Sequence, residues 1–258
     1  MKIDINCDMG ESFGTYKLGM DEEVIRYITS ANIACGWHAG DPLVMDKTVK
    51  MAVANGVGVG AHPGYPDLHG FGRRNMDCSS EDIRTFMIYQ IGALNAFCMA
   101  HGTKLRHVKP HGSLYLTAVE NEVVARSIAE AIASVNPELL YVVLAGAKGE
   151  LMTRIGTEVG LKVVYEAFPD RAYTPEGTLV SRREPGAVIK DPEEVAQRAL
   201  KMAKHGKVVA SDGSEISMNV QTLCVHGDTP DAVNLVRSIK KFLEAEGIEV
   251  NPMCESGV

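Results

Sequence analysis

The strongest constraint on the fold is a pattern that occurs four times along the chain. A short apolar segment runs into a histidine, and a glycine follows that histidine within two residues. The four histidines are His38, His62, His111 and His226. In parallel α/β proteins, side chains at the carboxyl ends of strands face the ligand, because the next loop leaves them exposed there. The repetition predicts that these histidines converge on one functional rim.

Helical and strand patterns alternate between these segments. The expected strands cover residues 3–7, 57–61, 105–109, 139–144, 162–165 and 222–225, together with the apolar stretch that begins at Asn32. The expected helices cover residues 22–28, 42–54, 79–101, 122–134, 148–160, 191–204 and 231–246, the first of them capped by Asp21. Asp212-Gly213 indicates a hairpin before the last main strand. The order predicts one α/β domain over residues 1–258, a TIM-like parallel (β/α) barrel with seven or eight strands.

Composition excludes several classes of function. The chain has 258 residues, 45% of them hydrophobic, and a formal net charge of −7 without a basic stripe, so nucleic acid is not expected as a partner. No apolar run approaches the roughly 20 residues of a membrane-spanning helix. The start at Met1 shows no leader pattern, and the six cysteines form no Cys-x-x-Cys pair. We therefore expect a cytoplasmic protein with reduced, structural cysteines.

Carboxylates stand at the same expected strand ends as the histidines. Asp8, Glu11, Asp41 and Asp228 are candidate general bases, with histidine as the proton donor or carrier. Asp41 has a second interpretation, because an aspartate directly before a helix-starting proline also caps the helix. Both roles of Asp41 remain open from the sequence.

Basic side chains are predicted on the same rim. They are Lys109, Arg73, Arg74, Arg171 and Arg182. Several cations beside carboxylates and imidazoles favour an anionic ligand, such as a carboxylate or a phosphate. Neither a Gly-x-x-x-x-Gly-Lys-Ser/Thr loop nor a Gly-x-Gly-x-x-Gly after a strand is present, so the usual nucleotide motifs are missing.

A metal site and a nucleophile are weaker expectations. Two imidazoles and a carboxylate such as Asp8 suffice for zinc, but no His-x-x-x-His pair lies on an expected helix. His107 and His111 are four residues apart, but the chain between them contains Pro110 and is expected to be extended. At about 3.3 Å per residue, their rings lie roughly 13 Å apart. We therefore expect no transition metal. Ser113 and Cys35 lack the Gly-x-Ser-x-Gly context of a nucleophile.

Long motifs resemble the LamB/YcsF family and extend over nearly the whole chain. They are Asp4-Ile5-Asn6-Cys7-Asp8-Met9-Gly10-Glu11, Asn32 to Pro42, Gly60 to Asp67, Gly70 to Arg74, Val108 to Tyr115, Glu166 to Tyr173 and Val225 to Pro230. The resemblance implies a TIM-like barrel related to the glycoside hydrolase and deacetylase barrels. It also implies one subunit of an enzyme that opens the lactam ring of 5-oxo-L-proline to L-glutamate, coupled to hydrolysis of ATP with Mg²⁺.

The same resemblance implies partner subunits B and C, which would hold much of the nucleotide; homo-oligomerisation stays open. The expected catalytic residues are Asp8, His38, Asp41, His62, Lys109 and His111. The expected substrate-binding residues are Glu11, Arg73, Tyr115, Asp170, Arg171, Arg182, His226 and Asp228. In this hypothesis Asp8 or Asp41 activates water, and Lys109 with the histidines stabilises the developing oxyanion or phosphate.

Two alternatives remain beside this hypothesis. The first is a metal-dependent deacetylase or amidase that acts on a carbohydrate-like substrate, because that barrel is shared. The second is a non-catalytic subunit that captures a carboxylated lactam or sugar for its partners.

Overall fold

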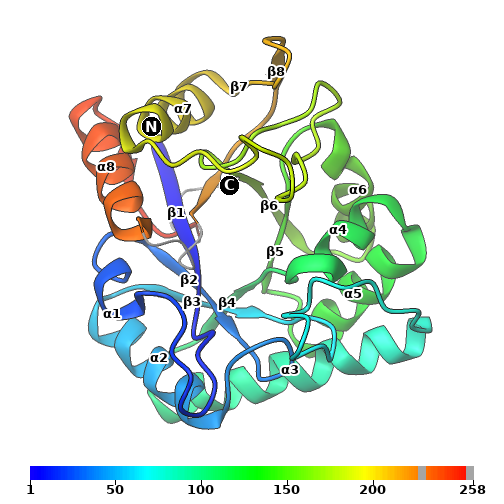
Figure 1. Ribbon diagram of the computed structural model, residues 1–258. Helices are drawn as coiled ribbons and strands as arrows, with labels where there is room; N and C mark the ends of the chain where they lie inside the picture. The colour runs from blue at the N-terminus through cyan, green and yellow to red at the C-terminus, as the bar shows by residue number, and fades with distance from the viewer. Residues whose placement is uncertain (226–230, 254–258) are drawn as a thin grey trace.

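A closed barrel of seven parallel strands forms the centre of the computed structural model, which describes residues 1–225 and 231–253 (Figure 1). The strands are β1 (Lys2–Met9), β2 (Ser30–Ala34), β3 (Gly58–His62), β4 (Leu105–Val108), β5 (Leu140–Leu144), β6 (Lys162–Ala167) and β9 (Thr222–Val225). β9 pairs in parallel with both β6 and β1, which closes the barrel. A short strand, β10 (Glu249–Val250), pairs with the start of β1. The predicted parallel barrel is confirmed.

Helices ring the strands on the outside of the barrel (Figure 1). They are α1 (Asp21–Val24), α2 (Pro42–Ala54), α3 (Ser80–Ala100), α4 (Gly112–Glu120), α5 (Glu122–Val135), α6 (Glu150–Glu158), α7 (Pro192–His205) and α8 (Ala232–Ala245), with the 3₁₀ turn η1 (Ala147–Gly149) before α6. The hairpin around Asp212-Gly213 is confirmed as β7 (Lys207–Val209) and β8 (Glu215–Ser217).

Local capping chemistry accounts for the helix starts that the sequence predicted well. The Asp41 carboxylate accepts hydrogen bonds from the backbone N–H groups of Leu43 and Val44 at the start of α2. Ser79 and Asp82 form a reciprocal capping box at the start of α3. Each cap satisfies backbone donors that have no partner inside the helix.

Three local expectations were wrong. Asp21 does not cap α1: it is the first residue of that four-residue helix, and its carboxylate accepts from the Gly10 N–H instead. No helix was expected between β4 and α5, yet α4 forms there and buries Leu114 and Tyr115. Finally, β6 continues beyond the expected end at residue 165, so Glu166 lies inside the strand and is completely buried.

The inside of the barrel is polar along β1. Asp4, Asn6 and Asp8 alternate with buried apolar residues, so they share one face of the strand. Asn6 donates to Thr222 on β9 at 2.6 Å, and Asn32 on β2 donates to the side-chain oxygens of Asn6 and Asp8 at 2.7 and 2.8 Å. This chain of hydrogen bonds leads from the barrel interior to its carboxyl end.

His107 on β4 completes this interior network. Its ring is completely buried, and Nε2 lies 2.8 Å from the Asn32 side-chain oxygen. Gly60 on the neighbouring β3 makes room for the ring, because a Cβ at position 60 would overlap it. His107 is therefore a structural histidine of the barrel interior.

Two glycine substitutions should change stability in opposite directions. Gly60→Ala should lower the free energy of unfolding by about 1–3 kcal/mol, because the new methyl group must displace the His107 ring. Gly92→Ala, inside α3 with no atom near the added Cβ, should raise it by about 0.5–1 kcal/mol through helix propensity. Urea unfolding of both variants measures the two shifts, and a destabilised Gly92→Ala would contradict this assignment of space.

Candidate active site

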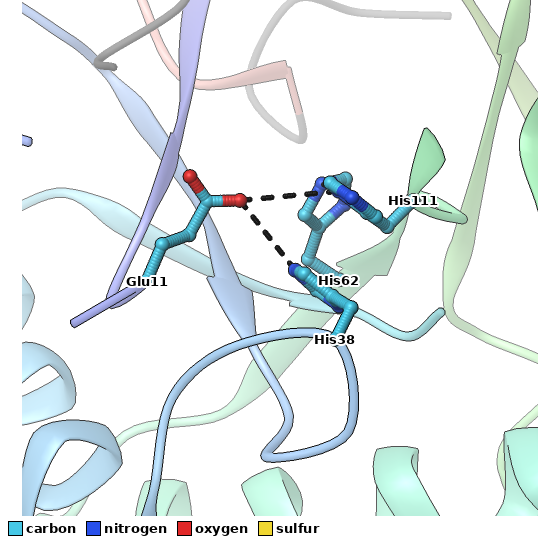
Figure 2. A group of neighbouring side chains, drawn as sticks. All are labelled: Glu11, His38, His62 and His111. Atoms are coloured by element: carbon cyan, nitrogen blue, oxygen red, sulfur yellow. Dashed lines mark hydrogen bonds and ion pairs between the residues drawn. The ribbon is translucent and has the colours of Figure 1, made fainter. Parts of the chain in front are cut away.

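Three of the four predicted histidines meet at the carboxyl end of the barrel. His38 follows β2, His62 ends β3, and His111 follows β4; Glu11, after β1, joins them (Figure 2). One ligand atom from each of the four residues lies within 4.8 Å of the others. We call these four residues the histidine cluster. His226 and Asp228 lie outside the described residues, so their predicted roles are not tested.

The cluster is packed tightly and is almost completely buried. The rings of His38 and His111 stack with a centroid distance of 3.7 Å and an interplanar angle of 3°. Glu11 Oε1 lies 3.5 Å from His38 Nε2 and 3.9 Å from His111 Nδ1 (Figure 2). His62 Nε2 lies 3.3 Å from Asp8 Oδ2. Strand ends and loops that are distant in the sequence therefore aim nitrogens and carboxylate oxygens at one small volume.

Two backbone carbonyls fix the orientation of His62 and His111. His62 Nδ1 lies 2.7 Å from the carbonyl oxygen of Lys109, and His111 Nε2 lies 2.8 Å from that of Phe71. A carbonyl oxygen only accepts, so both of these ring nitrogens carry the proton. The other nitrogens, His62 Nε2 and His111 Nδ1, lie 2.9 Å apart. In the neutral rings, two lone pairs face each other.

Burial keeps part of the cluster uncharged. It lowers the pKa of His38 and of His111 well below the usual value for histidine, and the neighbouring imidazoles lower both further. Neither ring nitrogen of His38 makes a hydrogen bond to any described residue. His38 therefore presents an unsatisfied imidazole to the centre of the cluster.

Lys109 links the cluster to the barrel interior. Its ammonium group lies 2.8 Å from Asp8 Oδ1, 2.9 Å from Glu166 Oε1 and 3.1 Å from Cys224 Sγ. Burial alone would lower the pKa of Lys109, but the adjacent groups, first of all Asp8, raise it well above the usual value. Lys109 is therefore a cation: it donates hydrogen bonds to Asp8 and Cys224, and its contact with Glu166 is an ion pair.

A cavity of about 850 Å³ opens beside Asp8, Lys109 and His111. Its wall carries three of the four arginines that the sequence placed near the rim, Arg73, Arg171 and Arg182. The fourth, Arg74, does not line the cavity and pairs with Asp67. Arg171 is tied to the fold, since it donates to the carbonyl oxygens of Ala187 and Val180. Arg73 is exposed, with its guanidinium 4.8 Å from the Phe71 ring. The site thus combines carboxylates at its floor with a cationic wall, and the wall suits a ligand with negative charge.

The remaining predicted residues occupy different places. Tyr115 lines the cavity, and its hydroxyl donates to Glu166 at 3.3 Å. Asp170 is buried just after β6. The Asp41 carboxylate also accepts from the Gly14 N–H, and these backbone contacts lower its pKa, which makes it a weaker base. Asp41 does not line the cavity. Its structural position is that of a helix cap.

Sequence reasoning missed Glu166 and Cys224 as partners of Lys109, and Asn32 as a support for Asp8. Glu166 was seen as a residue after a strand, and the other two were treated as strand residues without a role. An available signal was the polar side chain inside an apolar strand, which must find a partner when it is buried. Burial raises the pKa of Cys35 to about 12, in agreement with its expected role as an apolar filler.

A closed parallel barrel with histidines, carboxylates and a cavity at its strand ends defines a barrel protein with a small-molecule site. The chain belongs to the LamB/YcsF family, whose match covers residues 3–257. It is 55% identical over 253 residues to a protein of Pyrococcus abyssi that is named as the A subunit of 5-oxoprolinase, with 98% of each chain covered. It also resembles the crystal structure of a lactam utilization protein from Thermus thermophilus, with 48% identity, a TM-score of 0.92 and 97% and 99% of the two chains covered.

The barrel itself is shared more widely. The catalytic domain of a peptidoglycan N-acetylglucosamine deacetylase from Eubacterium rectale aligns with a TM-score of 0.52 at 14% identity, covering 99% of this chain and 90% of that one. This similarity confirms that the fold resembles that of deacetylase barrels. Within the described ranges, no helix combines the length and apolar character needed to cross a membrane.

Substitutions at Asp41 test its role as a cap. Asp41→Ala should lower the free energy of unfolding by about 1 kcal/mol, because the first N–H groups of α2 lose their acceptor. Asp41→Asn should keep most of that stability, since asparagine caps helices about as well as aspartate. Urea unfolding compares the two, and equal losses in both variants would contradict the capping assignment.

The stability of the protein should fall as the pH falls below 6.5, in part because of His107. Burial lowers the pKa of His107 to about 3 in the fold, so below pH 6.5 the unfolded chain binds a proton that the native state excludes. His107→Gln should flatten the dependence between pH 6.5 and 3 by up to about 1.4 kcal/mol per pH unit, the value for one proton. Urea midpoints over this range provide the measurement, and parallel profiles for the two proteins would refute it.

Proposed function

We propose that this chain is the A subunit of an ATP-dependent 5-oxoprolinase, which hydrolyses the lactam of 5-oxo-L-proline to L-glutamate. The names of its relatives support the proposal. The observation that carries it is the pairing of a carboxylate floor at Asp8 with an arginine wall around one cavity. A five-membered lactam with a carboxylate needs both features, a base for water and a cation for its anionic group.

ATP enters this reaction as a second substrate. An unstrained lactam is a poor electrophile, and transfer of a phosphoryl group to its amide oxygen makes the ring carbon open to attack by water. The chain lacks the usual phosphate-binding loops. We therefore assign most of the ATP and Mg²⁺ binding to partner subunits B and C, with the assembly in the cytoplasm. Arg73 and Arg182 on the cavity wall suit contacts to the lactam carboxylate and the transferred phosphoryl group.

Asp8 is the residue best placed to activate water. Its Oδ1 is held by Lys109 and Asn32, and the residue lines the cavity. Lys109 holds the carboxylates of Asp8 and Glu166 in place. Because Lys109 is buried against Asp8, Glu166 and Cys224, we assign it the role of positioning and neutralising these groups, and the negative charge that develops on the substrate falls to the arginines.

A reconstituted assay tests the proposal. The purified chain, mixed with subunits B and C, ATP and 5-oxo-L-proline, should release L-glutamate, and omission of the chain should abolish the release. Asp8→Asn should lower kcat by about 10²–10⁴-fold, the range for loss of a general base. The matched control is Asp46→Asn, a half-exposed residue of α2 that does not line the cavity, which should keep full activity.

Other outcomes point to the rival functions. Release of acetate from acetylated sugars without ATP would identify a deacetylase in place of a lactamase. Full glutamate release by a folded Asp8→Asn complex that still binds the lactam would make the chain a binding subunit. Loss of activity in His38→Ala or Lys109→Ala is expected, and unchanged rates in both folded variants would refute the assignment of this site.

A further inference from the structure

The histidine cluster has the composition and geometry of a metal site. We propose that Glu11, His38, His62 and His111 bind one divalent transition-metal ion of the zinc class. The proposal rests on the contacts of these side chains and does not depend on the proposed function, because metal binding is measured without substrate.

The facing lone pairs of His62 and His111 are the first argument. The carbonyl oxygens of Lys109 and Phe71 take the N–H groups of these rings, so His62 Nε2 and His111 Nδ1 face each other at 2.9 Å with lone pairs in both neutral rings. Repulsion between them is relieved in only two ways: a proton shared between the rings, or a cation bound by both.

His38 decides between these two arrangements. Its ring is completely buried, and neither nitrogen hydrogen-bonds to a described residue. A proton shared by His62 and His111 leaves the His38 ring unsatisfied at a cost of about 1–3 kcal/mol for a buried polar group. A metal ion bound by His38 Nε2 as well gives a partner to that nitrogen and to both facing lone pairs at once. A bound cation therefore explains the positions of all three histidines, whereas a shared proton explains only those of His62 and His111.

The supporting contacts are those that metal-bound histidines usually have. A ligating imidazole typically donates its other N–H to a carbonyl or a carboxylate, which fixes the tautomer and aims the lone pair. His62 and His111 both have such a carbonyl. Asp8 Oδ2, 3.3 Å from His62 Nε2, adds negative charge beside the cluster.

The distances between the donor atoms are close to those around a small ion. Four donors about 2.1 Å from zinc in a tetrahedron lie about 3.4 Å from one another. In the cluster the corresponding distances are 2.9 Å between His62 and His111, 3.5 Å between Glu11 and His38, and 3.9 Å between Glu11 and His111. The rings of His38 and His111 stack in parallel planes, so one of them must also turn about its side-chain bonds before both lone pairs reach the same ion.

The donor types select the class of metal. Imidazoles suit zinc, iron, cobalt, nickel and copper, whereas Mg²⁺ and Ca²⁺ take oxygen ligands. Three imidazoles and one carboxylate therefore favour a zinc-class ion over the Mg²⁺ that accompanies ATP. An ion in this place would lie beside Asp8 and the cavity, where it would be a fixed positive charge at the floor.

Metal analysis of the untagged, full-length chain tests the inference. Protein purified without chelators and analysed by mass spectrometry for metals should hold close to one zinc-class ion per chain. After removal of the ion with dipicolinate, added Co²⁺ should give the visible absorption bands of a low-coordinate site, and equimolar Zn²⁺ should abolish them. Both should raise the Tm of the stripped protein, and Mg²⁺ at the same concentration should not.

Variants assign the ion to the cluster. His38→Ala and Glu11→Gln should each weaken Co²⁺ binding by at least about 100-fold, as loss of a direct ligand should exceed the 10–100-fold effect of supporting contacts. His205→Ala, an exposed residue at the end of α7, is the matched control and should bind Co²⁺ like the unaltered protein. Circular dichroism checks the fold of each variant.

Two results would overturn the proposal. One is an unaltered protein that carries no bound metal and shows no Co²⁺ bands at millimolar Co²⁺, which would assign a shared proton to His62 and His111. The other is full Co²⁺ affinity in a folded His38→Ala variant. Neither result bears on glutamate release by the reconstituted complex, so failure of the metal site and failure of the proposed function are distinguishable.

Discussion

The buried ammonium group of Lys109 is the interaction on which the carboxyl end of the barrel depends. It joins Asp8 on β1, Glu166 on β6 and Cys224 on β9, three strands that lie far apart in the sequence. The cation offsets the cost of placing two buried carboxylates side by side. Removal of one partner from a buried ion pair costs about 3–5 kcal/mol, because a charge is left without compensation. The same ion pair holds Asp8 at the cavity.

Hydrogen bonds between buried polar side chains extend from Asp8 into the interior of the barrel. Asn32 donates to both Asn6 and Asp8, and its oxygen accepts from His107, so each amide atom has a partner. A network of this kind specifies one side-chain arrangement, since a partly satisfied set of buried polar groups is costly. The position of Asp8 is therefore determined from two sides, by the interior network and by Lys109.

Much of this fold could be predicted from the sequence where the signals are local. α2 and β9 have the expected boundaries, because Asp41-Pro42 marks a helix start and the strand is a short apolar run before a histidine. The convergence of His38, His62 and His111 followed from barrel topology. Glu166 was missed because its function depends on Lys109, a residue more than fifty positions away. α4 was missed because its apolar residues follow a Pro-His-Gly turn that resembles a loop.

The cluster itself could not be predicted from spacing alone. Searches for ligands within one helix or strand find no pair here, since each of the four residues comes from a different loop or strand end. The backbone carbonyls that fix the tautomers of His62 and His111 are also invisible in a sequence, because any residue supplies one. What can be read from the sequence is the common position of each histidine at a strand end.

The contacts also change the chemistry expected of these histidines. The sequence hypothesis used Lys109 and the imidazoles to stabilise an oxyanion, but the ammonium group of Lys109 is buried against Asp8, Glu166 and Cys224. The cluster directs lone pairs and a carboxylate toward its own centre, and such a centre repels an anion. It attracts negative charge only when it holds a cation. An oxyanion or a phosphoryl group in this cavity must therefore be stabilised by the arginine wall, by a bound ion, or by both.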